Sequence, residues 1–122
     1  MNDPMYPRPS AELAKRRSAL APKIDSAFRE FSQQVFADGA LPAKIKELIA
    51  VAVAHVTQCP YCIRGHTRSA QRRGATAEEI MEAIWVAAEM RAGAAFAHSA
   101  LALETLARPS ATDTTSENSP TR

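Results

Sequence analysis

Residues 57–66, TQCPYCIRGH, contain the only two cysteines of the chain, Cys59 and Cys62, spaced as a C-x-x-C pair. His66 follows Cys62 by four residues. In a reducing compartment, such a pair is more often catalytic or metal-binding than a structural staple. Three chemistries fit these residues: a redox dithiol, part of a metal site, or two ordinary buried thiols.

Pro60 predicts that a helix begins at the cysteines, because proline has no N–H to lose in the first turn of a helix. Cys59 then becomes the N-cap, and Cys62 lies in the first turn. Backbone N–H groups and the helix dipole concentrate positive charge at this end. That field favours a thiolate and lowers a cysteine pKa. The spacing also lets the two sulfurs form a small disulfide ring.

The spacing to His66 predicts unequal roles for the two thiols. Cys62 and His66 lie four residues apart and share one helix face. Cys59 is about 10 Å from His66 along the helix axis. A general base must reach the proton that it takes. We therefore predict Cys62 as the nucleophile, His66 as its base and Cys59 as the resolving thiol.

Glu47 is the best candidate to orient His66. If the helix that carries Glu47 turns near Gln58 and the next helix packs back antiparallel, Glu47 lies about 15 Å before the turn. His66 then lies about 10–12 Å after it, so the two side chains are nearly level. A carboxylate beside a buried stretch is usually paired or functional, because burying it alone is costly.

Two further residues near the cysteines have more than one interpretation. His55 is the only polar side chain in the apolar run 48–56 and precedes Cys59 by one turn. It is either a relay residue or a hydrogen-bonded core histidine. Tyr61, between the cysteines, is either a hydroxyl donor to a bound oxyanion or a packed ring.

The rest of the sequence predicts an all-α fold. It has no run of alternating β-branched residues and no Asn-Gly hairpin signal. Ser10 and the Thr76–Glu79 capping box mark helix starts, and Gly93 predicts a break or close contact. The expected helices span about residues 10–20, 22–37, 42–56, 59–73, 76–91 and 94–107.

The chain has more apolar side chains than one small subunit can bury. The run 48–56 is apolar all round apart from His55, which is typical of a helix buried on every side. The expected helix 94–107 carries apolar residues on two faces. We therefore expect partner subunits to supply part of the cover, in a homo-oligomer.

The chain is expected to form one domain, at about residues 10–108. Residues 1–9 and 109–122 are rich in proline and polar residues, so we expect a flexible N-terminal segment and a disordered tail. A net charge of +2 gives no indication of nucleic acid binding. With no signal peptide and no membrane-length apolar run, we expect a cytoplasmic protein without membrane partners.

Basic residues gather in two places. One is 15–17, and the other is Arg64, Arg68, Arg72 and Arg73. These clusters indicate either solvated helix faces or a docking face for an acidic partner.

The joint pattern Glu47, eleven residues, Cys59-Pro60-Tyr61-Cys62, three residues, His66 resembles the alkylhydroperoxidase D-like (AhpD-like) branch of the carboxymuconolactone decarboxylase superfamily. The resemblance covers about residues 40–100. It implies an all-helical bundle of about five to six helices, assembled as a homo-oligomer, commonly a trimer or hexamer. It also implies that Cys62 attacks the peroxide, that Cys59 closes the disulfide, and that Glu47 and His66 pass the proton.

This chain departs from the well-studied peroxidases of that branch at one position. They have a histidine directly before the second cysteine, where this chain has Tyr61. The complete proton relay of those enzymes therefore does not carry over, and His55 is the substitute that the sequence offers.

The leading hypothesis is a thiol-dependent peroxidase or disulfide oxidoreductase that reduces hydroperoxides. Its redox centre is the Cys59–Cys62 disulfide, it needs no bound cofactor, and a partner dithiol protein reduces it. One alternative is a decarboxylase-type lyase on the same fold, with Glu47 and His66 as acid and base. Another is a zinc site at Cys59, Cys62 and His66 with His55 or Glu47. The last is a non-catalytic oligomeric module.

Overall fold

The computed structural model describes residues 5–109 of the 122-residue chain. That part contains five helices and no strand, which confirms the all-α prediction. The helices are α1 (Ala11–Leu20), α2 (Pro22–Phe36), α3 (Ala43–Thr57), α4 (Pro60–Arg72) and α5 (Ala77–Ala107). None of these helices has the length and apolar content that a membrane span requires. The first four residues and, apart from Pro109, the predicted tail at 109–122 lie outside the described part.

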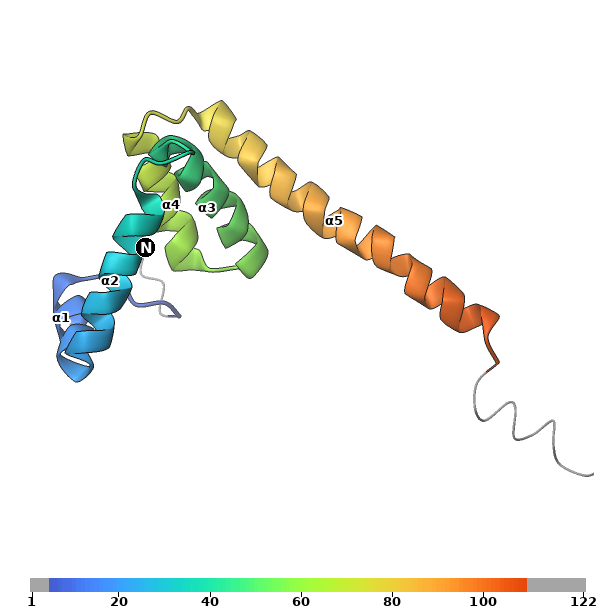
Figure 1. The fold of residues 1–122 in the computed structure, drawn as a ribbon, viewed down its shortest axis with the longest axis horizontal. Coiled ribbons are helices and arrows are strands. Elements are labelled where there is room, and N and C mark those ends of the chain that lie inside the picture. The colour runs from blue at the N-terminus through green and yellow to red at the C-terminus, as the bar shows by residue number, and fades with distance from the viewer. Residues whose placement is uncertain (1–4, 110–122) are drawn as a thin grey trace, which may run out of the picture.

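The helices form a small body from which one long helix projects (Figure 1). α3 and α4 lie side by side as an antiparallel pair, and the first half of α5 packs against α3. α1 and α2 form a second pair on the other side of α3 and α4. The second half of α5 extends away from the body and packs against none of the other described helices.

Local sequence signals account for the helix starts. The Ser10 hydroxyl accepts the Leu13 N–H at 3.1 Å and caps α1. Thr76 and Glu79 form the predicted capping box at the start of α5. α3 begins one residue later than expected, because Pro42 is its N-cap rather than part of its first turn.

The predicted break at Gly93 is wrong, because α5 runs without interruption from Ala77 to Ala107. Glycine costs about 1 kcal/mol in a helix interior relative to alanine. The alanine-rich sequence on both sides of Gly93 favours helix strongly enough to offset that cost. Nor does another element approach closely: a Cβ at Gly93 would meet only the flexible Glu89 carboxylate. The separate helix expected at 94–107 is therefore the second half of α5.

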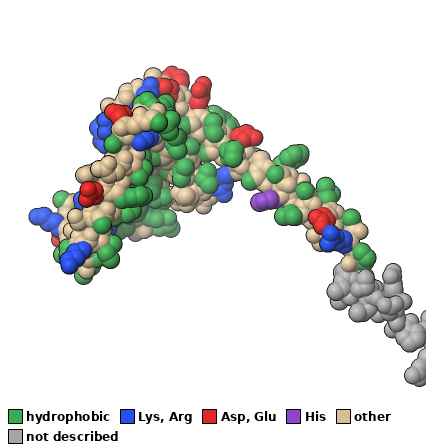
Figure 2. Space-filling model, in the orientation of Figure 1, with side chains coloured by type: hydrophobic (Ala, Val, Ile, Leu, Met, Phe, Trp, Pro, Cys, Tyr) green, Lys and Arg blue, Asp and Glu red, His purple; other side chains and the backbone are tan. Residues whose placement is uncertain are grey.

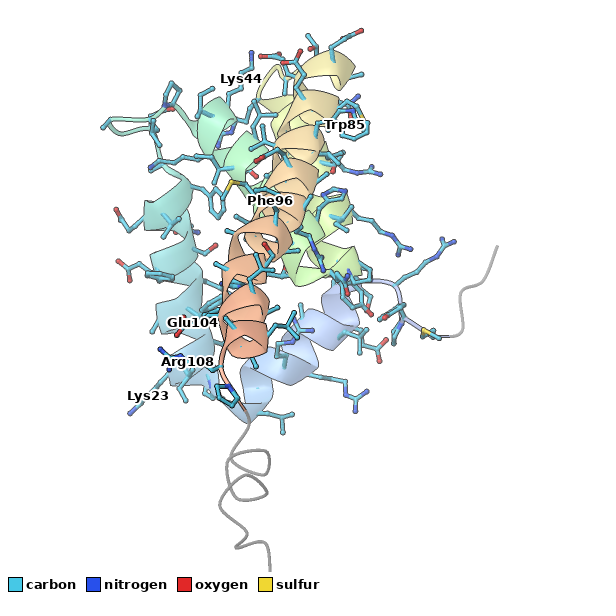
Figure 3. All side chains as sticks on the ribbon, turned by 90° about the vertical axis from the view of Figure 1, so that its right-hand side faces the viewer. Lys23, Lys44, Trp85, Phe96, Glu104 and Arg108 are labelled. Atoms are coloured by element: carbon cyan, nitrogen blue, oxygen red, sulfur yellow. The ribbon has the colours of Figure 1, made fainter. Side chains whose placement is uncertain are left out.

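The hydrophobic core is small and lies between α3, α4 and the start of α5. Val51 is fully buried, with Ala70 and Ala75 beside it. Leu48, Ile80 and Ile84 pack around this cluster. An ion pair between Lys44 and Glu79, at 2.9 Å, joins the starts of α3 and α5. Figure 3 places Lys44 at this end of the molecule and Glu104 at the opposite end of α5.

The chain leaves many apolar side chains uncovered. The other side of α3 exposes Ile49, Val53 and Val56, so the run 48–56 is buried on one side only. An apolar stripe of α2, at the i, i+4, i+7 and i+11 positions Ile24, Phe28, Phe31 and Val35, is exposed too. Phe96 in α5 is 82% exposed. Hydrophobic side chains are visible along the projecting half of α5 in Figure 2. The exposed apolar residues of α2 and of this half of α5 are Ile24, Phe28, Phe31, Val35, Phe96, Leu101, Leu103 and Leu106.

A pair of glycine substitutions tests the turn between α4 and α5. Gly74 has a φ of +92°, which is in the left-handed region that disfavours residues with a Cβ. We expect Gly74→Ala to lower the free energy of unfolding by about 1–2 kcal/mol. Gly39→Ala is the matched control, because a Cβ there makes only an ordinary contact with Lys46 Nζ at 3.6 Å. Chemical denaturation at one protein concentration measures both, and equal effects would contradict the prediction.

Candidate functional site

The connection between α3 and α4 consists of two capping residues. Gln58 ends α3 in the left-handed conformation, with φ 58° and ψ 47°. Cys59 follows directly as the N-cap of α4, and Pro60 is the first residue of that helix, as the sequence predicts. The chain therefore reverses within two residues, which sets α4 antiparallel to α3 and brings the middle of α4 level with the start of α3.

This reversal joins Glu47 of α3 to His66 of α4. Nδ1–H of His66 donates to Oε2 of Glu47 at 2.7 Å, which confirms the predicted contact. Glu47 is buried and His66 is half-buried. The His66 ring stacks on Phe36, with ring centroids 5.0 Å apart and planes 28° apart. Two contacts therefore fix the imidazole, and Nε2 is the nitrogen left to exchange protons.

The two cysteines are half-buried free thiols at the first turn of α4. Sγ of Cys59 accepts the backbone N–H of Cys62 at 3.2 Å, as an N-cap side chain does. A hydrogen bond from the Cys62 thiol, followed by this N–H, lowers the pKa of Cys59 below its ordinary value. The same thiol contact, together with burial, raises the pKa of Cys62. In the reduced pair, the negative charge therefore resides mainly on Cys59.

The opposite pKa shifts predict different alkylation profiles for the two thiols. Iodoacetamide reacts with the thiolate, and a lowered pKa gives more thiolate at a given pH. As pH rises, we expect Cys59 alkylation to accelerate at a lower pH than Cys62 alkylation. Brief labelling across a pH series, with peptide mass mapping, measures the two profiles separately. Coincident profiles, or an earlier rise at Cys62, would contradict the asymmetry.

The predicted contact between Cys62 and His66 is not made in this arrangement. The two residues lie one turn apart on α4, but within residues 5–109 no hydrogen bond joins their side chains. Nδ1 of His66 is occupied by Glu47, and Cys59 is the side chain that affects the pKa of Cys62 most. Catalytic hydrogen bonds are often long in the resting state and shorten when substrate binds. The role of His66 as base for Cys62 therefore stays a prediction.

His55 and Tyr61, the other two candidates from the sequence, form hydrogen bonds with residues other than Glu47 and His66. Nδ1–H of His55 donates to the Val51 carbonyl, at 2.7 Å within α3, which fits the interpretation of a hydrogen-bonded core histidine. The Tyr61 hydroxyl donates to the Pro7 carbonyl at 2.7 Å. Its ring also meets the Tyr6 ring edge-on. Tyr61 thus attaches the N-terminal segment to α4.

A cavity of about 620 Å³ opens beside Glu47 and His66. Phe36 and Arg73 line it, and sequence analysis assigned neither of them to the site. Phe36 lies outside the i, i+4, i+7 stripe of α2, so its contact with His66 has no local signal. Arg73 does continue the Cys62–His66 face of α4 by seven residues, and this spacing could have identified it. The other lining residues are Phe28, Arg29, Ser32, Gln33 and Ala37.

The described residues contain no group of three or more His, Cys, Asp or Glu side chains that could hold a metal ion. A structural zinc site needs about four such ligands. Glu47 binds His66, and His55 binds its own helix backbone. The arrangement of these side chains therefore lends the zinc alternative no support.

This chain is similar to a known protein family and to two bacterial proteins. The model of the carboxymuconolactone decarboxylase family matches residues 22–105. A Paracoccus denitrificans protein, described as uncharacterized protein 4 in the cox locus, is 61% identical over 106 residues. That match covers 87% of this chain and 95% of the relative. An uncharacterized protein of Cupriavidus necator is 42% identical over 96 residues, covering 75% of this chain and 85% of its own.

Two crystal structures share the fold. One is a Methanobacterium thermoautotrophicum protein, 34% identical with a TM-score of 0.65, which covers 68% of this chain and 93% of its own. The other is a Legionella pneumophila carboxymuconolactone decarboxylase family protein in its apo form. It is 40% identical with a TM-score of 0.61, and the match covers 76% of this chain and 82% of that one.

Proposed function

The chain belongs to the carboxymuconolactone decarboxylase family, and from this premise we propose that it is a thiol-dependent peroxidase acting through Cys59 and Cys62. The observation that carries the proposal is the thiol pair at the start of α4. Cys59 Sγ accepts the Cys62 N–H, so a thiolate is stabilised directly beside a second thiol. A peroxidatic pair needs both features, one sulfur to attack and one to resolve.

The reaction balances with these two sulfurs and one external dithiol. The Cys62 thiolate attacks a peroxide oxygen, the O–O bond breaks, and the alkoxide leaves as an alcohol after taking a proton. Cys62 is now a sulfenic acid. Cys59 attacks its sulfur, a disulfide forms, and hydroxide leaves as water after protonation. A partner dithiol protein reduces the disulfide by exchange and is itself oxidised, which suits the reducing cytoplasm where we propose the protein works.

The interaction between the two neighbouring thiols reconciles attack by Cys62 with the low pKa of Cys59. When the Cys62 proton moves to Cys59, the negative charge passes to Cys62, which becomes the attacking thiolate. His66 then serves the leaving group: its Nε2 exchanges a proton with the departing oxygen. Glu47 is a positioning residue, since it holds Nδ1 of His66 at 2.7 Å.

Stoichiometric peroxide tests this function on the intact protein. One equivalent of hydroperoxide should remove both thiols and lower the chain mass by two hydrogens, about 2 Da, through disulfide formation. Thiol titration and mass spectrometry measure this, and metal analysis of protein purified without chelator runs in parallel. A thiol count that stays at two after peroxide treatment would overturn the redox function.

One observation favours a second candidate, a decarboxylase-type lyase. The cavity beside Glu47 and His66 is lined by that pair but by neither cysteine. A buried carboxylate and an oriented imidazole facing a cavity could act as base and acid. Conversion of a lactone acid by the Cys59→Ser/Cys62→Ser double variant would support the lyase. Loss of all activity in that variant would favour the peroxidase.

We further propose that the chain works as a homo-oligomer of the trimer or hexamer type. The apolar side chains of α2 and of the second half of α5 are exposed in the single chain, and clustered exposed apolar side chains mark interaction surfaces. A second copy offers the same two surfaces, so closed symmetric assembly can cover both.

A further inference from the structure

A second cavity, of about 530 Å³, lies between the N-terminal segment 6–9 and the outer face of α4. Tyr61 holds the segment in place: its hydroxyl donates to the Pro7 carbonyl, and its ring meets that of Tyr6 with centroids 6.0 Å apart. The cavity has a volume typical of small-molecule sites, about 300–1,000 Å³. It is lined by Tyr6, Arg8, Pro9, Tyr61, Arg64, Gly65 and Arg68, so it is separate from the Glu47–His66 cavity.

The lining of this second cavity carries concentrated positive charge. Arg64 and Arg68 are four residues apart on one face of α4, and Arg8 approaches from the N-terminal segment. None of the ion pairs within residues 5–109 involves Arg64 or Arg68. The guanidinium groups of Arg64 and Arg68 repel each other, and a bound anion relieves that repulsion. Their planar donors match carboxylate and phosphate oxygens.

Gly65 is a second feature that indicates a ligand in this cavity. It lies inside α4, where glycine destabilises a helix relative to alanine. A Cβ built on Gly65 meets no atom within 4 Å, so no neighbour in the subunit requires a glycine there. Because Gly65 has no side chain, the cavity stays open between Arg64 and Arg68, and a ligand would fill this space.

We propose that this cavity binds a small organic oxyanion, a carboxylate or phosphate compound. The arginines hold the anionic group, and the rings of Tyr6 and Tyr61 contact the organic part. A recess of this volume between the segment and the helix favours a small molecule over the acidic surface of a partner protein. Because Tyr61 stands between Cys59 and Cys62 in the chain, ligand bound here lies next to the turn that carries the thiols.

Calorimetric titration of the full chain at low ionic strength tests the site. The probes are benzoate, its neutral isostere benzamide, and inorganic phosphate. We expect an anion to bind and benzamide to bind at least about 10-fold more weakly, since charge-assisted hydrogen bonds supply most of the affinity. Binding of benzoate assigns the carboxylate class, and binding of phosphate alone assigns the phosphate class. Equal binding of benzoate and benzamide, or no binding of either anion, would overturn the site.

Variants locate the binding. Arg64→Ala/Arg68→Ala should weaken anion binding at least about 10-fold. Arg72→Ala is the matched control, an exposed arginine of α4 that bonds Ser69 outside the cavity, and it should change affinity less than about 2-fold. Gly65→Leu should abolish binding without lowering the unfolding midpoint, because leucine favours helix. Unchanged binding in Gly65→Leu, or equal losses in the arginine variants, would place the anion elsewhere. None of these readouts depends on peroxide turnover.

Discussion

Cys62→Ser is expected to lower hydroperoxide consumption at least about 1,000-fold, because a serine hydroxyl is not ionised near neutral pH and is a poor nucleophile. It should form no sulfenic acid. Steady-state consumption with a dithiol reductant measures the loss. Dimedone labelling, followed by peptide mapping, shows whether any sulfenic acid forms.

Cys59→Ser should behave differently, and the difference identifies the attacking sulfur. Without a resolving thiol, Cys62 is oxidised once and stops at a dimedone-reactive sulfenic acid, so one equivalent of peroxide is consumed. The low pKa of Cys59 supplies the opposing outcome. A sulfenic acid on Cys59 in the Cys62→Ser variant would reverse the two roles. Arg72→Ala, a change in the last turn of the same helix, is the control and should retain full turnover.

Phe96→Asp/Leu103→Asp is expected to dissociate the protein to single subunits of 13.2 kDa. Both side chains lie on the projecting half of α5, with exposed fractions of 82% and 65% in the single subunit. Burying each in an assembly contributes about 1.5–3 kcal/mol, and the charged replacements oppose burial. We expect the unfolding midpoint to fall by about 10 °C or more.

Light scattering coupled to size exclusion measures the mass, and thermal unfolding at several concentrations measures the coupling of assembly to stability. Leu20→Asp is the matched control, since Leu20 is an exposed leucine at the end of α1, outside the apolar surfaces of α2 and α5. It should leave the mass unchanged. A wild-type protein that runs at subunit mass would contradict the proposed assembly, and so would a double variant that keeps the wild-type mass.

The parts of the site that follow from local rules were predictable from the sequence. Pro60 fixes the start of α4, which makes Cys59 the N-cap. The helical rise then places Glu47 and His66 level across an antiparallel pair, and the structure has that contact. Each step depends on residues close in sequence or on regular helix geometry.

Contacts between distant segments were not predictable in this way. Phe36 stacks on His66 across 30 residues of sequence, and Pro7 accepts the Tyr61 hydroxyl across 54. No periodicity encodes either contact. The break predicted at Gly93 was wrong for another reason, because the helix preference of a long alanine-rich segment outweighs the cost of one glycine. The unequal thiol pKa values depend on which sulfur accepts hydrogen bonds, and only the folded turn decides that.

The connection between α3 and α4 has only two residues, so the length of this connection is as important to the site as the identity of its side chains. Gln58 and Cys59 are both caps, so no unstructured residue between the helices can absorb an insertion. One extra residue would turn α4 by about 100° about its axis and shift it by about 1.5 Å. Such a rotation would direct His66 away from Glu47 while every side chain of the site remained in the sequence. The angular phase of α4 relative to α3 is thus set at a single point of the backbone.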